Sequence, residues 1–173
     1  DHATTNIYTL DTQGNELDFV NTNQNYWSDE VTTSAGLTWY NSSFWVTSVD
    51  DRSLLYEVDP SDGSTISTIT MPGSYYCKAL EFYDNAFWVL DYVDSSTATI
   101  HKLDTSGNPI DSSQIGIGSY WLGMTQKNGH FYIAYDSSGR IAIKNLDPTT
   151  FDVLKQGSID YPVTDTALTG ITN

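Results

Sequence analysis

A short phrase that recurs four times constrains the fold of this chain more than any other feature. In each copy two hydrophobic residues, separated by two positions, are followed by an aspartate and then by turn-forming residues. The four aspartates are Asp11, Asp59, Asp104 and Asp147, so successive copies lie 48, 45 and 43 positions apart. A period in the forties, built from short alternating segments, is typical of small β-sheets repeated around an axis.

A second phrase repeats with the same period. It pairs a segment such as Gly36-Leu37-Thr38-Trp39 with a following aromatic segment such as Phe44-Trp45-Val46. The equivalent pairs are Ala79-Leu80-Glu81-Phe82 with Phe87-Trp88-Val89, and Gly123-Met124-Thr125-Gln126 with Phe131-Tyr132-Ile133. The first segment of another copy is Gly170-Ile171-Thr172-Asn173. The small residue and the first aromatic are eight positions apart in each complete pair. The two phrases together predict a four-stranded unit.

The order of strands within one unit follows from the turns. Asn, Asp and Gly residues between the first two strands favour a tight hairpin. The third strand ends at the repeated aspartate, whose carboxylate we expect to cap the next turn. The fourth strand has the weakest pattern, as expected for an outer edge. No segment shows a sustained helical period, so we expect almost no helix.

The repeats resemble the blades of secreted bacterial β-propellers, including the NHL-like, gluconolactonase-like and glutaminyl-cyclotransferase-like groups. The resemblance rests on the two phrases above and covers almost the whole chain. It implies an all-β propeller of four-stranded antiparallel blades, whose first strands line a central channel. Because such blades occur in families of unrelated activity, the resemblance implies a fold and not a function.

The repeats divide the chain as one propeller domain. We expect a partial blade in residues 1–35, blades in 36–78, 79–122 and 123–169, and the start of another in 170–173. Three arrangements follow: a four-bladed ring with one thin blade, a piece of a larger propeller, or an arc completed by a second copy. The ends that fall inside blades favour the piece of a larger propeller.

Six aromatic residues of the second strands are expected to pack between neighbouring blades. They are Phe44, Trp45, Phe87, Trp88, Phe131 and Tyr132. One buried aromatic ring removes about 150–250 Å² from water, so these residues are predicted to form the core.

The charge limits the partners of the protein. Seven basic and 22 acidic residues give a formal net charge of −15. Such a negative field argues against nucleic acid and against anionic membrane surfaces. It suits an extracellular medium, including one that contains calcium. Because Cys77 is the one cysteine, we expect no internal disulfide and no cysteine-rich metal site. No apolar run is long enough for membrane insertion.

A candidate binding face combines aromatic and acidic residues. The connections from a fourth strand to the next first strand carry Tyr26, Trp27, Tyr75, Tyr76, Tyr120 and Trp121. The connections from second to third strands carry acids, of which we select Asp50, Asp91 and Asp136. Because the two sets of connections share one end of a propeller, the residues suit sugars, cationic groups, or calcium that bridges a polyol. The alternative is that the aromatics cover the blade ends and the acids only terminate strands.

Glu81 is the one candidate catalytic residue. It stands where the other first strands have a threonine, and a carboxylate in the channel could act as a base, bind a cation or pair with Lys78 or Lys127. The glutaminyl-cyclotransferase-like resemblance implies an acidic residue at this end of the channel, but no companion acid–base set accompanies Glu81. The histidines occupy different repeat positions, which argues against a shared zinc site.

The sequence favours a non-enzymatic, extracellular recognition or scaffold module that binds a protein or a glycan without a cofactor, apart from calcium. Two alternatives stay open. One is a channel-mouth enzyme that uses Glu81, either cyclotransferase-like or a metal-dependent hydrolase. The other is a structural subunit of a surface appendage or layer, in which copies self-associate through incomplete blades.

Overall fold

The computed structural model describes residues 6–22, 36–48, 51–73, 75–117, 122–137 and 140–160. These residues form fourteen strands and no helix. Accordingly, nothing in the described ranges has the helical length and apolar character needed to cross a bilayer.

The strands form four sheets, in which neighbours along the chain are also neighbours in the sheet. Blade A comprises β1 (Asn6–Leu10) and β2 (Glu16–Asn21). Blade B comprises β3 (Leu37–Tyr40), β4 (Ser43–Thr47), β5 (Leu54–Val58) and β6 (Thr65–Thr70). Blade C comprises β7 (Cys77–Tyr83), β8 (Ala86–Asp94), β9 (Thr97–Leu103) and β10 (Pro109–Gly116). Blade D comprises β11 (Leu122–Lys127), β12 (His130–Asp136), β13 (Arg140–Leu146) and β14 (Val153–Asp160). All pairings are antiparallel, which confirms the predicted four-stranded units for B, C and D.

The hairpin between the first two strands of each complete blade uses the predicted turn chemistry. In blade C, Asp84 and Asn85 have φ of 52° and 56°, and in blade D Asn128 and Gly129 have φ of 53° and 81°. Positive φ at both central positions is the geometry of tight hairpin turns that match the twist of the flanking strands.

The repeated aspartates cap the next turn, as the sequence predicts. The Asp11, Asp59, Asp104 and Asp147 carboxylates each accept the backbone N–H two residues later, at 2.8, 2.7, 2.8 and 2.7 Å. A β-bulge precedes each turn and leaves one residue of the outer strand unpaired. The unpaired residues are Leu17, Ile66, Ile110 and Leu154, all at least 50% exposed. The outer strand is therefore an exposed edge.

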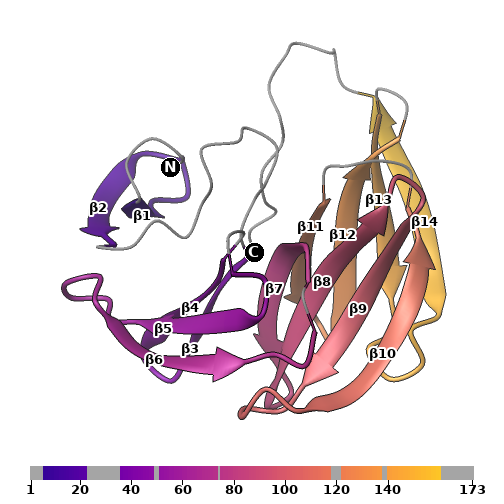
Figure 1. Ribbon diagram of the computed structural model, residues 1–173. Helices are drawn as coiled ribbons and strands as arrows, with labels where there is room; N and C mark the ends of the chain where they lie inside the picture. The colour runs from indigo at the N-terminus through magenta and orange to yellow at the C-terminus, as the bar shows by residue number, and fades with distance from the viewer. Residues whose placement is uncertain are drawn as a thin grey trace.

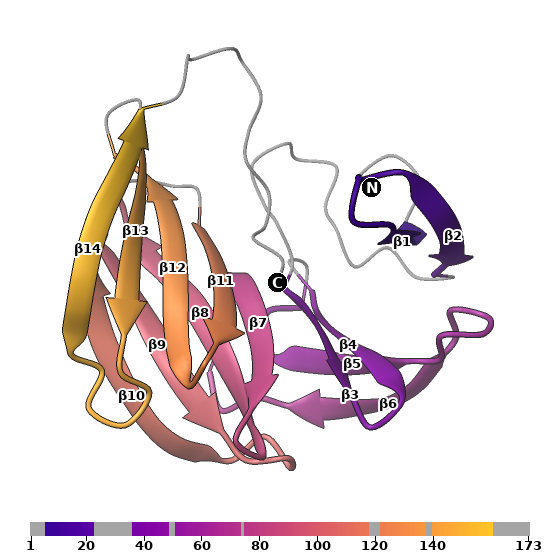
Figure 2. The same cartoon turned by 180° about the vertical axis from the view of Figure 1, so that it is seen from behind.

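Blades B, C and D stand face to face, and β7 lies beside both β3 and β11 (Figure 1). The view from behind shows the same order, with blade A at one end of the series and blade D at the other (Figure 2). Side chains of the second strands fill the two internal interfaces. The rings of Trp45 and Phe87 lie 4.8 Å apart between B and C, and those of Trp88 and Phe131 lie 4.6 Å apart between C and D.

The six predicted core aromatics divide into two groups. Trp45, Phe87, Trp88 and Phe131 are at most 5% exposed, which agrees with the prediction of packing between blades. Phe44 and Tyr132 are half-buried. The difference follows from position, because these two residues lie on the faces of B and D that look away from blade C.

Candidate functional site

Residues at one repeat position of the first strands tie neighbouring blades together. The Phe82 N–H of blade C donates to Thr38 Oγ1 of blade B at 3.0 Å. At the equivalent place, the Gln126 N–H of blade D donates to Glu81 Oε1 at 3.2 Å. A polar side chain on each inner strand therefore accepts a backbone N–H from the next blade.

Glu81 is enclosed by hydrogen-bond donors from both sides. The hydroxyls of Thr38 and Thr125 also hydrogen-bond to its carboxylate. Burial raises the pKa of Glu81, and these hydrogen bonds oppose the shift. The ion pairs His101–Asp91 and Lys102–Asp84 do not include Glu81. Glu81 therefore has the same role in blade C as Thr38 has in blade B. Its longer side chain accepts a backbone N–H of the following blade.

Metal binding has no support in the described ranges, where no group of three or more His, Cys, Asp or Glu residues is arranged to hold an ion. Cys77 is buried, and burial raises the pKa of its thiol to about 12. A thiol with such a pKa is neutral at physiological pH and is a poor metal ligand or nucleophile.

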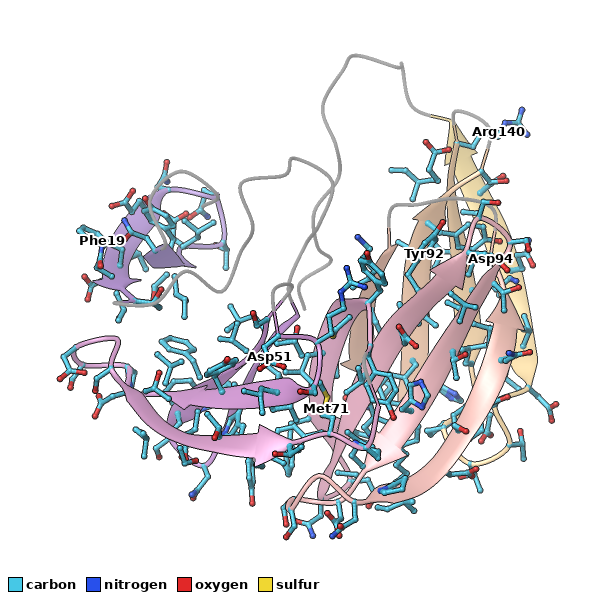
Figure 3. The ribbon with its side chains drawn as sticks, in the orientation of Figure 1. Phe19, Asp51, Met71, Tyr92, Asp94 and Arg140 are labelled. Carbon is cyan, nitrogen blue, oxygen red and sulfur yellow. The ribbon has the colours of Figure 1, made fainter. Side chains whose placement is uncertain are left out.

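The predicted binding face lies where β8 and β12 end and β9 and β13 begin. Figure 3 shows Tyr92, Asp94 and Arg140 along this edge, with Asp51 near the corresponding end of blade B. The Asp94 carboxylate accepts the Ser96 N–H and hydroxyl, both at 2.7 Å, and these bonds lower the pKa of Asp94. Asp94 is thus an exposed turn cap with a charge that persists into acidic solution.

An arginine covers one of the predicted aromatic residues. The Arg52 guanidinium carbon lies 3.1 Å from the centre of the Tyr76 ring, and Tyr76 is 38% exposed. The neighbouring backbones hold this pair in place, because the Tyr75 N–H donates to the Arg52 carbonyl at 3.0 Å and the Tyr92 N–H donates to the Tyr76 carbonyl at 2.9 Å. The result is a cation–π pair on a braced loop.

A lysine lies near another aromatic ring of the same face. Lys78 Nζ is 6.0 Å from the centre of the Tyr92 ring. Burial lowers the pKa of Lys78, and the nearby Arg52 charge lowers it further. The Arg52–Tyr76 and Lys78–Tyr92 pairs together form a surface that we call the cation–tyrosine face.

Beside this face, a histidine joins two of the predicted site residues. The rings of Tyr75 and His101 stack with their centres 4.1 Å apart, and His101 Nε2 lies 3.5 Å from Asp91 Oδ2. Tyr75 packs against the core cluster between blades B and C. Its pKa is raised by burial and by the Asp91 charge. This group therefore braces the blade interface below the exposed surface.

The structure thus separates the predicted site residues into three sets. Tyr75, Tyr76 and Asp91 come together, and Asp136 ends β12 on blade D. The predictions for Tyr26, Trp27, Asp50, Tyr120 and Trp121 lie outside the described residues.

The sequence prediction missed the basic side chains of this face. Arg52 and Lys78 are two of only seven basic residues, and each lies within two positions of a predicted site residue. Their rarity in so acidic a chain is the signal that could have identified them. Where the structure describes it, the face is mixed in charge and carries both cations and acids.

Comparisons with known proteins identify the fold. No family model matches the sequence, and no curated protein matches it. Among solved structures, the WD40 domain of Toxoplasma gondii coronin matches with a TM-score of 0.52 and 18% identity over 80% of this chain and 39% of that one. Hydrazine synthase of Kuenenia stuttgartiensis matches with a TM-score of 0.50 and 12% identity over 87% of this chain and 42% of that one. Bacteroides ovatus xyloglucan PUL GH43B matches with a TM-score of 0.51 and 13% identity over 76% of this chain and 29% of that one.

These similarities establish an all-β propeller built of four-stranded antiparallel blades. The chain spans about two fifths of the length of the hydrazine synthase and coronin chains. At such low identities the shared feature is the fold, on which many unrelated functions are built.

Proposed function

We propose that this protein is a non-enzymatic recognition or scaffold module that binds a protein partner through the cation–tyrosine face. Propellers generally serve as scaffolds for protein interactions. The observation that carries the proposal is the Arg52–Tyr76 pair, in which Tyr76 is exposed and Arg52 is half-buried, and which backbone hydrogen bonds hold on both sides. Tyrosine and arginine are enriched among the residues that dominate binding energy, and a pre-ordered pair loses little entropy on binding.

The same geometry favours a protein over a glycan as the partner. A sugar stacks on an open aromatic face, whereas Arg52 occupies one face of Tyr76 and Lys78 lies over Tyr92. A mixed set of tyrosines, cations and acids instead suits the polar and charged side chains of a protein surface. The partner that fits best carries acidic groups opposite Arg52 and basic groups opposite Asp94.

We place the module outside the cell, as an extension of the same proposal. A net charge of −15 keeps an extracellular protein soluble and favours encounters with basic surfaces. The narrower resemblance to NHL-like or cyclotransferase-like propellers and a calcium requirement are further predictions. We do not propose catalysis, because hydrogen bonds from two neighbouring blades already engage the Glu81 carboxylate.

A comparison of two variants tests this function. The protein and its Arg52→Ala/Tyr76→Ala variant are used to capture partners by crosslinking in the extracellular fraction of the source culture. Ile110→Ala, which changes an exposed residue at the bulge of β10, is the control. We expect a protein that the wild type and the control capture and that the double variant loses by at least tenfold.

Two further measurements separate the alternatives. A glycan array and a calcium titration are run on the same three proteins. Glycan binding that the wild type shows and the Arg52→Ala/Tyr76→Ala variant loses would mean that the partner is a glycan and not a protein. Identical capture by all three proteins would refute the assignment to the cation–tyrosine face.

A further inference from the structure

Blade C departs from blades B and D at the end that carries the cation–tyrosine face. On β7, the pairing with β8 skips Lys78, and on β8, the pairing with β9 skips Val93. Each of these is an extra residue in its strand, which is the definition of a β-bulge. The corresponding strand pairs of blades B and D show no such shift over their described residues. Two neighbouring bulges therefore distinguish this end of blade C.

The bulge at Lys78 reverses the direction in which the preceding side chains point. In a regular strand, residues two positions apart lie on the same face. Cys77, however, belongs to the core cluster between blades B and C, whereas Ala79 belongs to the cluster between C and D. Tyr75 packs against the same cluster as Cys77. The bulge thus directs Tyr75 and Cys77 into the interface between B and C and leaves Tyr76 on the opposite side.

The second bulge places an apolar side chain beside the cations. Val93 is 50% exposed, although β8 is buried from Ala86 to Leu90. Figure 3 shows Tyr92 and Asp94, which flank Val93, at the exposed end of this strand. Because the Tyr92 ring also lies near Lys78, the face combines an exposed aliphatic residue with positive charge.

Two positive charges lie close together on this face. Burial lowers the pKa of Lys78, and repulsion by the Arg52 charge lowers it further. The acids at the edge of the face are engaged elsewhere, because Asp51 and Asp94 cap their own turns and accept serine hydroxyls at 2.6 and 2.7 Å. Within the described residues, no carboxylate forms an ion pair with Arg52. An anion held between the two cations would relieve their repulsion.

We propose that this face binds an acidic segment of the partner, with a glutamate or aspartate carboxylate between Arg52 and Lys78 and an aliphatic side chain against Val93. A guanidinium that stacks on an aromatic ring presents its N–H edge, which matches a carboxylate. β-Bulges re-aim side chains and are common beside functional sites. A carboxylate carries a single charge, so aspartates at the edge of the face repel it less than they repel a phosphate. The inference rests on the proposed function and specifies the chemistry of the partner.

Nuclear magnetic resonance of the isotope-labelled protein tests the inference with defined peptides. The probe is acetyl-Ser-Glu-Leu-Glu-Leu-Ser-amide, and two matched peptides replace Glu with Gln or Leu with Ser. We expect saturable shifts of the Tyr76, Lys78 and Val93 amide signals, with binding about tenfold weaker for the glutamine peptide and about threefold weaker for the serine peptide. Equal binding of the acidic and glutamine peptides, or no binding at millimolar concentration, would overturn the inference. Displacement of the probe by less inorganic phosphate than acetate would overturn the assignment of a carboxylate.

Variants of the protein locate the site. Lys78→Gln should weaken binding of the acidic peptide about fivefold, Lys78→Arg should restore it, and Val93→Ser should abolish the preference for leucine over serine. Lys144→Gln is the matched control, because Lys144 Nζ also lies near a tyrosine ring, 5.4 Å from the centre of Tyr135, but in a regularly paired part of β13. It should bind like the wild type. Equal weakening by Lys144→Gln and Lys78→Gln would show unspecific attraction and overturn the inference.

The partner-capture experiment separates this inference from the function on which it rests. Capture that Arg52→Ala/Tyr76→Ala loses, but that Lys78→Gln and Val93→Ser keep, would overturn the inference and leave the proposed function intact. Identical capture by the wild type and the double variant would instead refute the proposed function itself. Circular dichroism identical to that of the wild type confirms that each variant is folded.

Discussion

Blade C and blade A carry the same third-strand phrase and differ most in how it is buried. In blade C both hydrophobic positions are covered, with Ile100 at 1% and Leu103 at 0% exposed. In blade A Ile7 is 4% exposed but Leu10 is 55% exposed. Among the described residues the difference lies in the number of neighbouring blades, since blade C has one on each side and blade A has one. A blade of this protein is therefore a sheet whose core is made by its neighbours.

The largest effect should come from removing an aromatic residue of an internal interface. Trp88→Ala deletes a fully buried ring that packs on Phe131, and we expect a loss of about 3–5 kcal/mol of unfolding free energy. Tyr132→Ala at the equivalent position of blade D should cost about 1–2 kcal/mol, because its ring is only half-buried. Urea denaturation at a concentration where the chain is monomeric measures both values. Equal losses would show that the face of blade D that looks away from blade C is covered like the internal faces.

The next effect compares two glycine turns of the same backbone shape. Gly14 and Gly107 both have φ of 85°, so alanine is strained at either position by about 1–2 kcal/mol. At Gly107 the added carbon would also overlap Ile69 and Thr70, and we expect a total loss of about 3 kcal/mol. Thermal unfolding of Gly14→Ala and Gly107→Ala gives the difference. If the two variants melt together, the packing of the turn on the preceding blade contributes nothing.

A smaller effect should appear in the pH dependence of stability. Burial raises the pKa of Glu81, so the folded protein holds this proton more tightly than the unfolded chain does. The stability linked to Glu81 is therefore fully present below the ordinary glutamate pKa and is lost as the pH rises through the raised value. Glu81→Gln should remove this loss, so its unfolding free energy should fall less than that of the wild type between acidic and neutral pH.

Asp104 provides a contrast for this experiment. Hydrogen bonds from Asn108 lower the pKa of Asp104 below its ordinary value. Its stabilising contribution is present above the ordinary pKa and is lost as the pH falls through the lowered one. Asp104→Asn should therefore reduce the fall in unfolding free energy at acidic pH. Glu81→Gln should instead reduce the fall that occurs at higher pH, where Glu81 loses its proton. Indistinguishable profiles for the two variants would contradict the assigned directions.

The last prediction concerns the chemical reactivity of Cys77 and involves no change in unfolding free energy. Burial raises the thiol pKa to about 12, and the reactive thiolate is therefore almost absent at neutral pH. A thiol reagent such as 5,5′-dithiobis(2-nitrobenzoic acid) should label Cys77 only after unfolding. Fast labelling of the native protein would show that the interface between blades B and C opens, unlike the packed clusters seen there.

Much of the fold could be predicted because the repeated phrases encode local geometry. Asn and Asp at the hairpin turns adopt positive φ, and the repeated aspartates accept N–H groups two residues away. These are interactions over a few positions of the chain, which a short motif specifies. The outer strands were also identified, since their apolar residues are sparse and exposed.

The candidate site was predicted less completely. Tyr75, Tyr76 and Asp91 were selected from their places in the repeat, and the structure does bring them together. Their partners Arg52 and His101 come from other strands and connections, at distances that no motif records. The role of Glu81 changed for the same reason, because its hydrogen-bond donors lie on the two flanking blades.

The sequence by itself determined the blade: its four strands, its turns and the alternation that gives it two apolar faces. Only the tertiary structure decided which of those faces are buried, which rings are covered by cations, and that Glu81 joins neighbouring inner strands. The physical reason is that turn geometry and strand pairing depend on residues close together in the chain. Burial and charge pairing depend on which side chains of a neighbouring blade lie opposite, and these contacts form only when the blades pack together.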